Sequence, residues 1–292
     1  MLLAFACLLN GPSRLLSQDL KLTEATQHIE KRISDSHADV GIVFRTLDGK
    51  TAWTYHPDDS FHAASTMKVP VMIELFHQER EGKLRLDDPL TIRNEFHSIV
   101  DGSVYKLDPK DDSDTALYEA EGQTRPVSQL CELMITMSSN LATNLLIEKL
   151  GVENIRNAVH AMGAAGMNVL RGVEDGKAFE KGLNNTTTAE GLAVLLTAIA
   201  EGKAVDADAS RQMVEILSRQ HFNDGIPAGL PPGMKVAHKT GEITKIHHDA
   251  AIVYAPKPFV LVILVRGLAE RKDSAALMAD ITGLLYQATE SL

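Results

Sequence analysis

The segment Ala63-Ala64-Ser65-Thr66-Met67-Lys68-Val69-Pro70 marks the point where this chain of 292 residues changes from strand-like to helix-like sequence. From here on, apolar residues recur at the three-to-four spacing of one helix face, at Met67, Val71, Met72, Leu75 and Phe76. Pro70 is tolerated because it falls close to the first turn. We therefore predict a helix that begins near Ser65.

On the N-terminal side of this segment the sequence predicts a β-hairpin. Residues 38–45 and 51–55 are rich in strand-forming side chains, and they flank Asp48-Gly49. An Asp-Gly pair between two such runs is a strong hairpin signal because its residues suit a tight turn.

On the C-terminal side the chain is first helical and then returns to strand. Periodicity predicts helices over 127–137, 141–150, 152–162, 188–201 and 210–219, with Thr186, Thr187 or Thr188 as the N-cap of the fourth. Strands at 234–239, 249–254 and 259–265 follow, and a closing helix covers 274–287. The last strand is apolar on both faces, as is typical of a strand covered on two sides.

Strands at both ends of the chain with helices between them indicate an α+β fold. We predict one antiparallel sheet that is built from both chain ends, with the helical middle inserted as a lobe. The polar stretch Asn94–Arg125 is expected to be a long surface loop within this lobe.

Composition and charge limit the partners. The chain has 29 Lys and Arg against 39 Asp and Glu, a net charge of −10, so it lacks the basic surface of a nucleic-acid binder. The apolar run Met1–Leu9 is too short to span a bilayer, which needs about 20 residues. It resembles the core of an export signal, and lipidation of Cys7 is an alternative. If this start is removed, only Cys131 remains, and its helical apolar context predicts a buried thiol.

Three motifs carry the candidate chemistry. Ser65 and Lys68 share a helix face, so the amine can activate the hydroxyl as a nucleophile. A second Ser-x-x-Lys at 103–106 lies in a polar loop and is taken as coincidence. Ser138-Ser139-Asn140 falls between two predicted helices, and Lys239-Thr240-Gly241 ends a predicted strand, where Gly lets a substrate backbone approach. In this order the three resemble the signature of class A β-lactamases and penicillin-binding proteins, Ser-x-x-Lys, Ser-Asp-Asn and Lys-Thr-Gly.

The segments at 63–70 and 135–140 both resemble class A serine β-lactamases, and the resemblance runs from about Thr23 to the C-terminus. It implies the serine β-lactamase/transpeptidase fold, with an α/β lobe (23–62 and 220–292) and an all-α lobe (63–219) around a cleft. It also implies a monomer exported to the periplasm or secreted, with residues 1–22 as an export signal or a disordered start.

The resemblance assigns catalytic roles to matching residues. Ser65 would attack the lactam carbonyl and form an acyl-enzyme, and Lys68 would help to take its proton. Ser138 would relay a proton to the leaving nitrogen. The backbone N–H groups of Ser65 and Glu242 would form the oxyanion hole, where a donor is typically worth about 3–4 kcal/mol.

Substrate binding follows from the same resemblance. Asn140 would hydrogen-bond the side-chain amide of the substrate. Lys239 and Thr240 would bind its carboxylate by opposite charge and a hydroxyl donor. Gly241 and Glu242 would line the same wall.

Hydrolysis of the acyl-enzyme needs a base that activates water, and the family uses a Glu-x-x-Leu-Asn element for it. Glu180-Lys181-Gly182-Leu183-Asn184 resembles this element, with Glu180 as the general base and Asn184 as the second holder of the water.

Two departures from the family pattern leave alternatives open. The threonines at 186–188 follow almost at once, so the loop is short, and Ala178 stands where the family has Arg. A short loop can leave Glu174 or Asp175 nearer the acyl bond, with Glu180 a solvated carboxylate. Smaller departures are Ser139, which replaces the usual Asp of the middle motif, and the long loop before this motif.

No metal or organic cofactor is expected. Neighbouring strand residues point to opposite faces, so the group His238, His247, His248 and Asp249 does not form a natural ligand set. The acidic run Asp108–Asp114 lacks the spacing of a calcium loop and is expected to be solvated.

The sequence thus predicts hydrolysis of a β-lactam through a serine acyl-enzyme. The alternative is a penicillin-binding, D-Ala-D-Ala peptidase-like or esterase enzyme with slow lactam deacylation, which acts on a peptidoglycan-like peptide or an ester. A class D enzyme fits less well because of Asn140. A non-catalytic binding module is disfavoured because both Ser65 and Lys68 are present.

Overall fold

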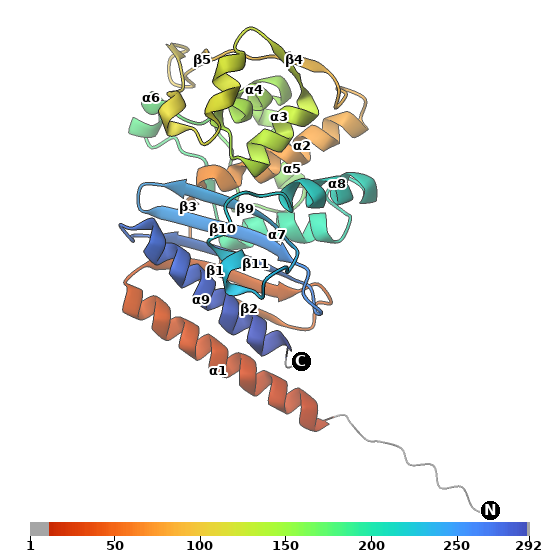
Figure 1. The fold of residues 1–292 in the computed structure, drawn as a ribbon, viewed down its shortest axis with the longest axis vertical. Coiled ribbons are helices and arrows are strands. Elements are labelled where there is room, and N and C mark those ends of the chain that lie inside the picture. Colours follow the sequence, from red (N-terminus) through yellow and green to blue (C-terminus); the bar gives the residue numbers. More distant parts are fainter. Residues whose placement is uncertain (1–11, 291–292) are drawn as a thin grey trace, which may run out of the picture.

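A computed structural model describes residues 12–290, with side chains from residue 20 onward (Figure 1). Met1–Leu9 and Cys7 lie outside the described residues, so the export signal and the lipidated start remain predictions. Residues 12–22 belong to a helix, so the described part of the predicted disordered start is helical.

One five-stranded antiparallel sheet is assembled from the two ends of the chain, as the sequence predicts. Its strand order is β2 (Ala52–Tyr55), β1 (Asp39–Thr46), β11 (Phe259–Arg266), β10 (Ile246–Val253) and β9 (Val236–Ile243). The predicted hairpin is β1–β2, with Ile42 opposite Tyr55. Because β11 pairs with both β1 and β10, it joins the two ends of the chain at the centre of the sheet.

Helices cover both faces of this sheet. On one face lie α1 (Pro12–Ser36) and α9 (Arg271–Glu290), and on the other lies α7 (Ala189–Ala200), which contacts β1, β10 and β11 (Figure 1). Phe259 and Ile263 of β11 belong to the apolar cluster of α1 and α9, and Val260 and Val262 belong to the cluster of the helical lobe. The two-sided apolar pattern of this strand is therefore confirmed.

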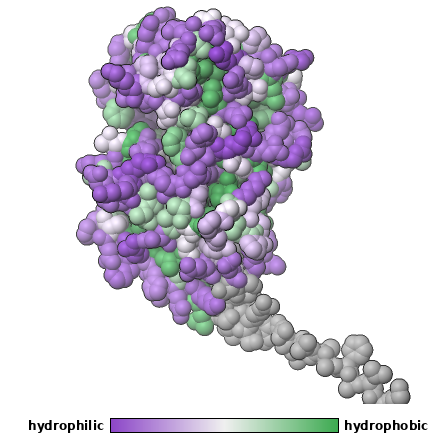
Figure 2. Space-filling view, in the orientation of Figure 1, coloured by the Kyte–Doolittle hydropathy of each residue, from purple (hydrophilic) through white to green (hydrophobic). Residues whose placement is uncertain are grey.

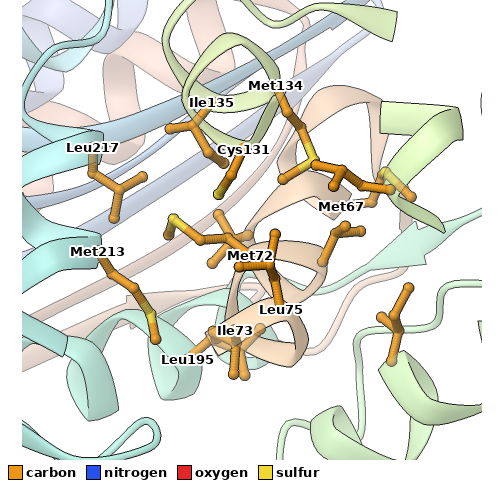
Figure 3. Close-up of a cluster of buried hydrophobic side chains, with 14 of the residues drawn as sticks. Met67, Met72, Ile73, Leu75, Cys131, Met134, Ile135, Leu195, Met213 and Leu217 are labelled. Atoms are coloured by element: carbon orange, nitrogen blue, oxygen red, sulfur yellow. The ribbon is translucent and has the colours of Figure 1, made fainter. Parts of the chain in front are cut away.

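The other predicted helices form the helical lobe beyond α7. They are α2 (Lys68–Arg80), α3 (Val127–Thr136), α4 (Asn140–Leu150), α5 (Val152–Ala161) and α8 (Ala207–Leu217). Met72 of α2, Met134 of α3 and Met213 of α8 lie together in a fully buried cluster (Figure 3). Thr188 is the N-cap of α7, and its hydroxyl accepts a hydrogen bond from the Gly191 amide at 3.0 Å. Of the three threonines predicted as possible N-caps, Thr188 is thus confirmed.

Several elements differ from the predictions. The helices α1 and α6 (Gly176–Glu180) were not expected, although Ala25, Ile29 and Ile33 give α1 a buried stripe at helical spacing. The loop 94–125 is not wholly irregular. It contains β5 (Phe96–His97), β6 (Val104–Tyr105), η2 (Pro109–Asp111), η3 (Thr115–Ala120) and β7 (Thr124–Pro126), and β7 pairs with β4 (Pro89–Thr91).

The surface in view is largely hydrophilic (Figure 2). Between residues 12 and 290, no helix is both long enough and apolar enough to cross a membrane.

Cys131 is buried in the helical lobe, as predicted, and burial raises the pKa of its thiol to about 12 (Figure 3). Since the thiolate is the reactive form, we expect Cys131 to resist alkylation by iodoacetamide in the native protein at pH 8 and to react after unfolding in guanidinium. Mass analysis of the peptide that contains Cys131 measures both states. Rapid native labelling would show that the packing around this helix opens.

Candidate active site

Ser65 lies in a 3₁₀ turn, η1 (Ala64–Met67), that leads directly into α2. Ala64 before it has a φ of +45°, an uncommon backbone conformation for a non-glycine residue. This turn is held in place because the Ala64 amide donates to His62 Nδ1 at 3.0 Å and the Thr66 hydroxyl donates to the Ala63 carbonyl at 2.6 Å. Ser65 is half-buried and lines a cavity of about 380 Å³.

Lys68 begins α2 and is fully buried. Its amine donates three hydrogen bonds, to the carbonyl of Ser138 at 2.6 Å, to the hydroxyl of Ser138 at 3.2 Å and to Oδ1 of Asn140 at 2.8 Å. Ser138 has a φ of +59° in the turn between α3 and α4, which brings both acceptors to the same amine. Two of the three sequence motifs are thereby in contact.

The third motif reaches the same hydroxyl from the sheet. Lys239 is buried on β9, and its amine donates to Ser138 Oγ at 3.0 Å and to the Thr240 carbonyl at 2.9 Å. A serine oxygen can accept two hydrogen bonds, so Ser138 can receive both amines. The Lys-Thr-Gly motif lies within β9 rather than at its end, because the strand continues to Ile243.

Burial makes both amines weakly basic. The pKa of Lys68 is lowered to about 7 by desolvation, and the nearby charges of Asp112 and Glu174 limit the shift. The pKa of Lys239 is also lowered far below its ordinary value, by desolvation and then by the charge of Lys68. A Lys68 amine that is partly neutral at pH 7 can accept a proton.

Glu174 is the carboxylate that the structure brings into this network. Its Oε1 accepts a hydrogen bond from Asn140 Nδ2 at 2.7 Å, so Asn140 links Lys68 to Glu174. Glu174 lines the same cavity as Ser65, and burial raises the pKa of its carboxyl. A half-buried carboxylate of this kind is a stronger base than a solvated one.

Glu180, predicted as the general base, is placed elsewhere. It ends α6, is exposed, and does not line the cavity of Ser65. Asp175 caps the intervening helix by accepting a hydrogen bond from the Ala178 amide at 3.1 Å, and Glu180 is the last residue of that helix. The structure therefore favours Glu174, which the short loop left open, over Glu180.

The other loop residues serve as anchors. Asn184, predicted to hold the water, accepts a hydrogen bond from Arg171 at 3.1 Å, and Arg171 also donates to the Leu183 carbonyl at 2.8 Å. Asp175 accepts from the Ser98 hydroxyl at 2.9 Å and from the Ile99 amide at 3.0 Å. Arg171 was missed because its partners are distributed over the loop rather than set at one spacing.

Thr240 is buried, and Glu242 lines the cavity with its carboxylate bonded to Arg271 Nε at 2.7 Å. Gly241 has a structural use that differs from the expected approach of substrate. A Cβ there would lie 3.1 Å from the backbone nitrogen of Ser65 and 3.0 Å from Thr66 Cγ2. Glycine thus lets β9 pack directly on the turn that carries Ser65.

We expect Gly241→Ala to slow acylation by about tenfold, because the new methyl group pushes β9 away from the Ser65 amide. The loss should be smaller than that caused by removing an oxyanion-hole donor altogether. Intact mass against time with benzylpenicillin measures the rate. Gly283→Ala is the matched control, since a Cβ there meets only Gly229 O at 3.4 Å. Equal rates in both variants would contradict this use of Gly241.

The histidines near β9 and β10 have protein partners. His238 Nδ1 lies 2.9 Å from Asp249 Oδ1, and His247 Nδ1 lies 3.0 Å from Ser274 Oγ. His248 bonds the His62 carbonyl at 3.0 Å. His247 and His248 therefore face opposite sides of the sheet, as strand alternation predicts.

The acidic run Asp108–Asp114 is only partly solvated, so that prediction is wrong for two of its members. Asp112 and Asp114 are buried, with exposed fractions of 7% and 8%. Both lie beside the turn at Ser139, and sequence spacing gave no signal of this contact because the loop and the turn are far apart in the chain.

The sheet from both chain ends, the inserted helices and the Ser–Lys–Ser–Lys arrangement define the fold shared by β-lactamases and penicillin-binding proteins. A profile of the Beta-lactamase enzyme family matches residues 23–289, so the chain belongs to this family.

Known proteins agree with this placement. The chain is 28% identical to Beta-lactamase 3 of Bacillus cereus over 283 residues, which cover 91% of this chain and 81% of that protein. It is 25% identical to a β-lactamase of Bacillus licheniformis over 280 residues, covering 91% and 84%. The solved structure of PBP-A superposes with a TM-score of 0.80 at 28% identity and covers 93% of this chain and 97% of that one. A variant of PBP-A is known as an acyl-enzyme complex with penicillin G.

Proposed function

We propose that this protein hydrolyses the amide bond of β-lactams through a serine acyl-enzyme. The observation that carries the proposal is the carboxylate of Glu174, bonded to Asn140 in the cavity that Ser65 lines. A carboxylate there can activate water against an ester on Ser65. Membership of the Beta-lactamase enzyme family supports the substrate class.

In the acylation step, Ser65 Oγ forms a bond to the lactam carbonyl carbon and passes its proton to the neutral amine of Lys68. The carbon–nitrogen bond breaks as Ser138 donates its hydroxyl proton to the leaving nitrogen and takes a proton from the Lys68 ammonium, which lies 3.2 Å away and thereby returns to its neutral form. Lys239 and Thr240 bind the substrate carboxylate, and the Ser65 and Glu242 amides bind the oxyanion.

In the deacylation step, Glu174 takes a proton from water, and the water oxygen attacks the ester carbonyl carbon. The ester bond breaks, the product acid leaves, and the proton returns to Ser65.

We place this activity in the periplasm or outside the cell, on the basis of the resemblance of Met1–Leu9 to an export signal.

A time course with a chromogenic cephalosporin, followed by absorbance and intact mass together, tests the proposal. Many turnovers with little adduct are expected, and Ser65→Ala should abolish both turnover and adduct. A stoichiometric adduct that persists without turnover would indicate a penicillin-binding enzyme instead. An adduct on the Ser65→Ala variant would overturn the assignment of the nucleophile.

A further inference from the structure

The carboxylate of Asp112 reaches the start of α4 from a distant loop. Its Oδ2 accepts hydrogen bonds from the Asn140 amide at 2.8 Å, the Leu141 amide at 3.0 Å and the Tyr118 hydroxyl at 2.9 Å. Its Oδ1 accepts from the Asp114 amide at 3.1 Å. Four donors surround this one buried side chain.

These contacts complete the cap of α4. The first amides of a helix have no partner within the helix. Ser139 satisfies the Ala142 amide at 3.3 Å with its side chain, and Asp112 satisfies the two amides before it. A negative charge at this end also interacts favourably with the helix dipole.

The capped residues are those that hold the catalytic amine. Ser138 and Asn140 provide all three hydrogen-bond acceptors of Lys68, and Asn140 also bonds Glu174. Because Ser138 has a positive φ, its turn needs support from its surroundings. Asp112 holds the amides two and three residues after Ser138.

The charge of Asp112 acts on the same amine. The charges of Asp112 and Glu174 favour the protonated form of Lys68, whereas the charge of Lys68 itself lowers the pKa of the neighbouring Lys239. Asp112 is therefore placed to influence both the geometry and the basicity of the site.

We propose that Asp112 is a positioning residue for acylation: its carboxylate caps α4 and thereby fixes Ser138 and Asn140 around Lys68. The proposal rests on the proposed function for its rate measurement, and its structural part is independent of it. The loop 94–125, expected to be only a surface loop, thus supplies an essential support of the site.

Two substitutions separate the two effects. Asp112→Asn keeps an oxygen for the amides and removes the charge, whereas Asp112→Ala removes both. Asp111→Asn is the control, because Asp111 is exposed on the same loop and loses the same charge. Each variant is assayed for adduct formation with benzylpenicillin by intact mass from pH 5 to 9, and for hydrogen exchange at the amides of Asn140 and Leu141.

For Asp112→Ala we expect acylation to slow by about tenfold or more and the two amides to exchange about tenfold faster. For Asp112→Asn we expect a smaller loss, with the acid limb of the acylation profile moved down by roughly 0.5 to 1 pH unit, since the ammonium form of Lys68 loses a nearby opposite charge. A merely structural residue would not move this limb. Asp111→Asn should match the wild type.

Wild-type exchange and acylation in Asp112→Ala would overturn the proposal, as would an unmoved acid limb in Asp112→Asn. If Asp112→Ala does not fold, Asp112→Asn and the exchange data decide alone. Absence of any adduct on the wild-type protein would instead count against the proposed function, and the amide exchange would still test the cap.

Discussion

Glu174→Gln is expected to form the acyl-enzyme with benzylpenicillin and then to remain acylated. The amide keeps the size of the side chain and can still pair with Asn140, so Ser65 and Lys68 retain their geometry. It cannot accept a proton from water at neutral pH, so deacylation should slow by about 10² to 10⁴-fold. Intact mass will show the adduct build up within the first turnover and persist, while absorbance shows one burst and no steady rate.

Glu180→Gln is the matched comparison, because it makes the same change six residues further along the same loop. Glu180 is exposed and outside the cavity of Ser65, so this variant should turn over like the wild type. The reverse result, with a trapped adduct only in Glu180→Gln, would restore the element at 180–184 as the deacylation machinery. Two trapped variants would mean that the loop moves as a unit during hydrolysis.

The pH dependence of deacylation gives a second view of the same carboxyl. Burial raises the pKa of Glu174, and only the ionised form can act as base. Deacylation should therefore lose rate on acidification at a higher pH than an exposed glutamate would give, and Glu174→Gln should have no such limb. Single-turnover decay of the isolated adduct measures this limb without interference from acylation.

The elements that could be predicted from sequence are those whose signal is local. The apolar run of β11 and the Ser-x-x-Lys at the start of α2 depend on residues a few positions apart, and the structure contains both. For the same reason the sequence limits the N-cap of α7 to three consecutive threonines at 186–188, and in the structure the cap is Thr188. Helix α1 carried its own local stripe at Ala25, Ile29 and Ile33 and was predictable.

The parts that the sequence left open or missed depend on contacts between distant segments. Glu174 joins the site because Asn140, 34 residues away, donates to it, and Asp112 joins because it reaches amides 28 and 29 residues away. The short helix α6 separates Glu174 from Glu180, and a five-residue helix has no periodicity to detect. The spacing at 180–184 resembles the family element, but it carries no information on which carboxylate lines the cavity of Ser65.

After substitution of Ser65, substitution of Lys68 should cause the largest loss in the rate of acylation. Lys68→Ala removes the amine that joins Ser138 to Asn140, and Lys68→Arg keeps a positive charge but cannot act as a base at neutral pH. Acylation by benzylpenicillin should fall by about 10² to 10⁴-fold in both variants if Lys68 accepts the proton of Ser65. A near-normal rate in Lys68→Arg would show that only its positive charge matters.

The pH profile decides between these two roles in the unmodified protein. Burial lowers the pKa of Lys68 to about 7, and the neutral amine is the form that accepts a proton. The wild-type acylation rate should therefore rise with pH through about 7, falling about tenfold for each unit below it, and level off above. A positive charge needed at this position would give the opposite sign, a rate that falls as pH rises through 7. Stopped-flow acylation between pH 5 and 9 distinguishes the two directions, and a limb that persists in Lys68→Arg would assign it to another group.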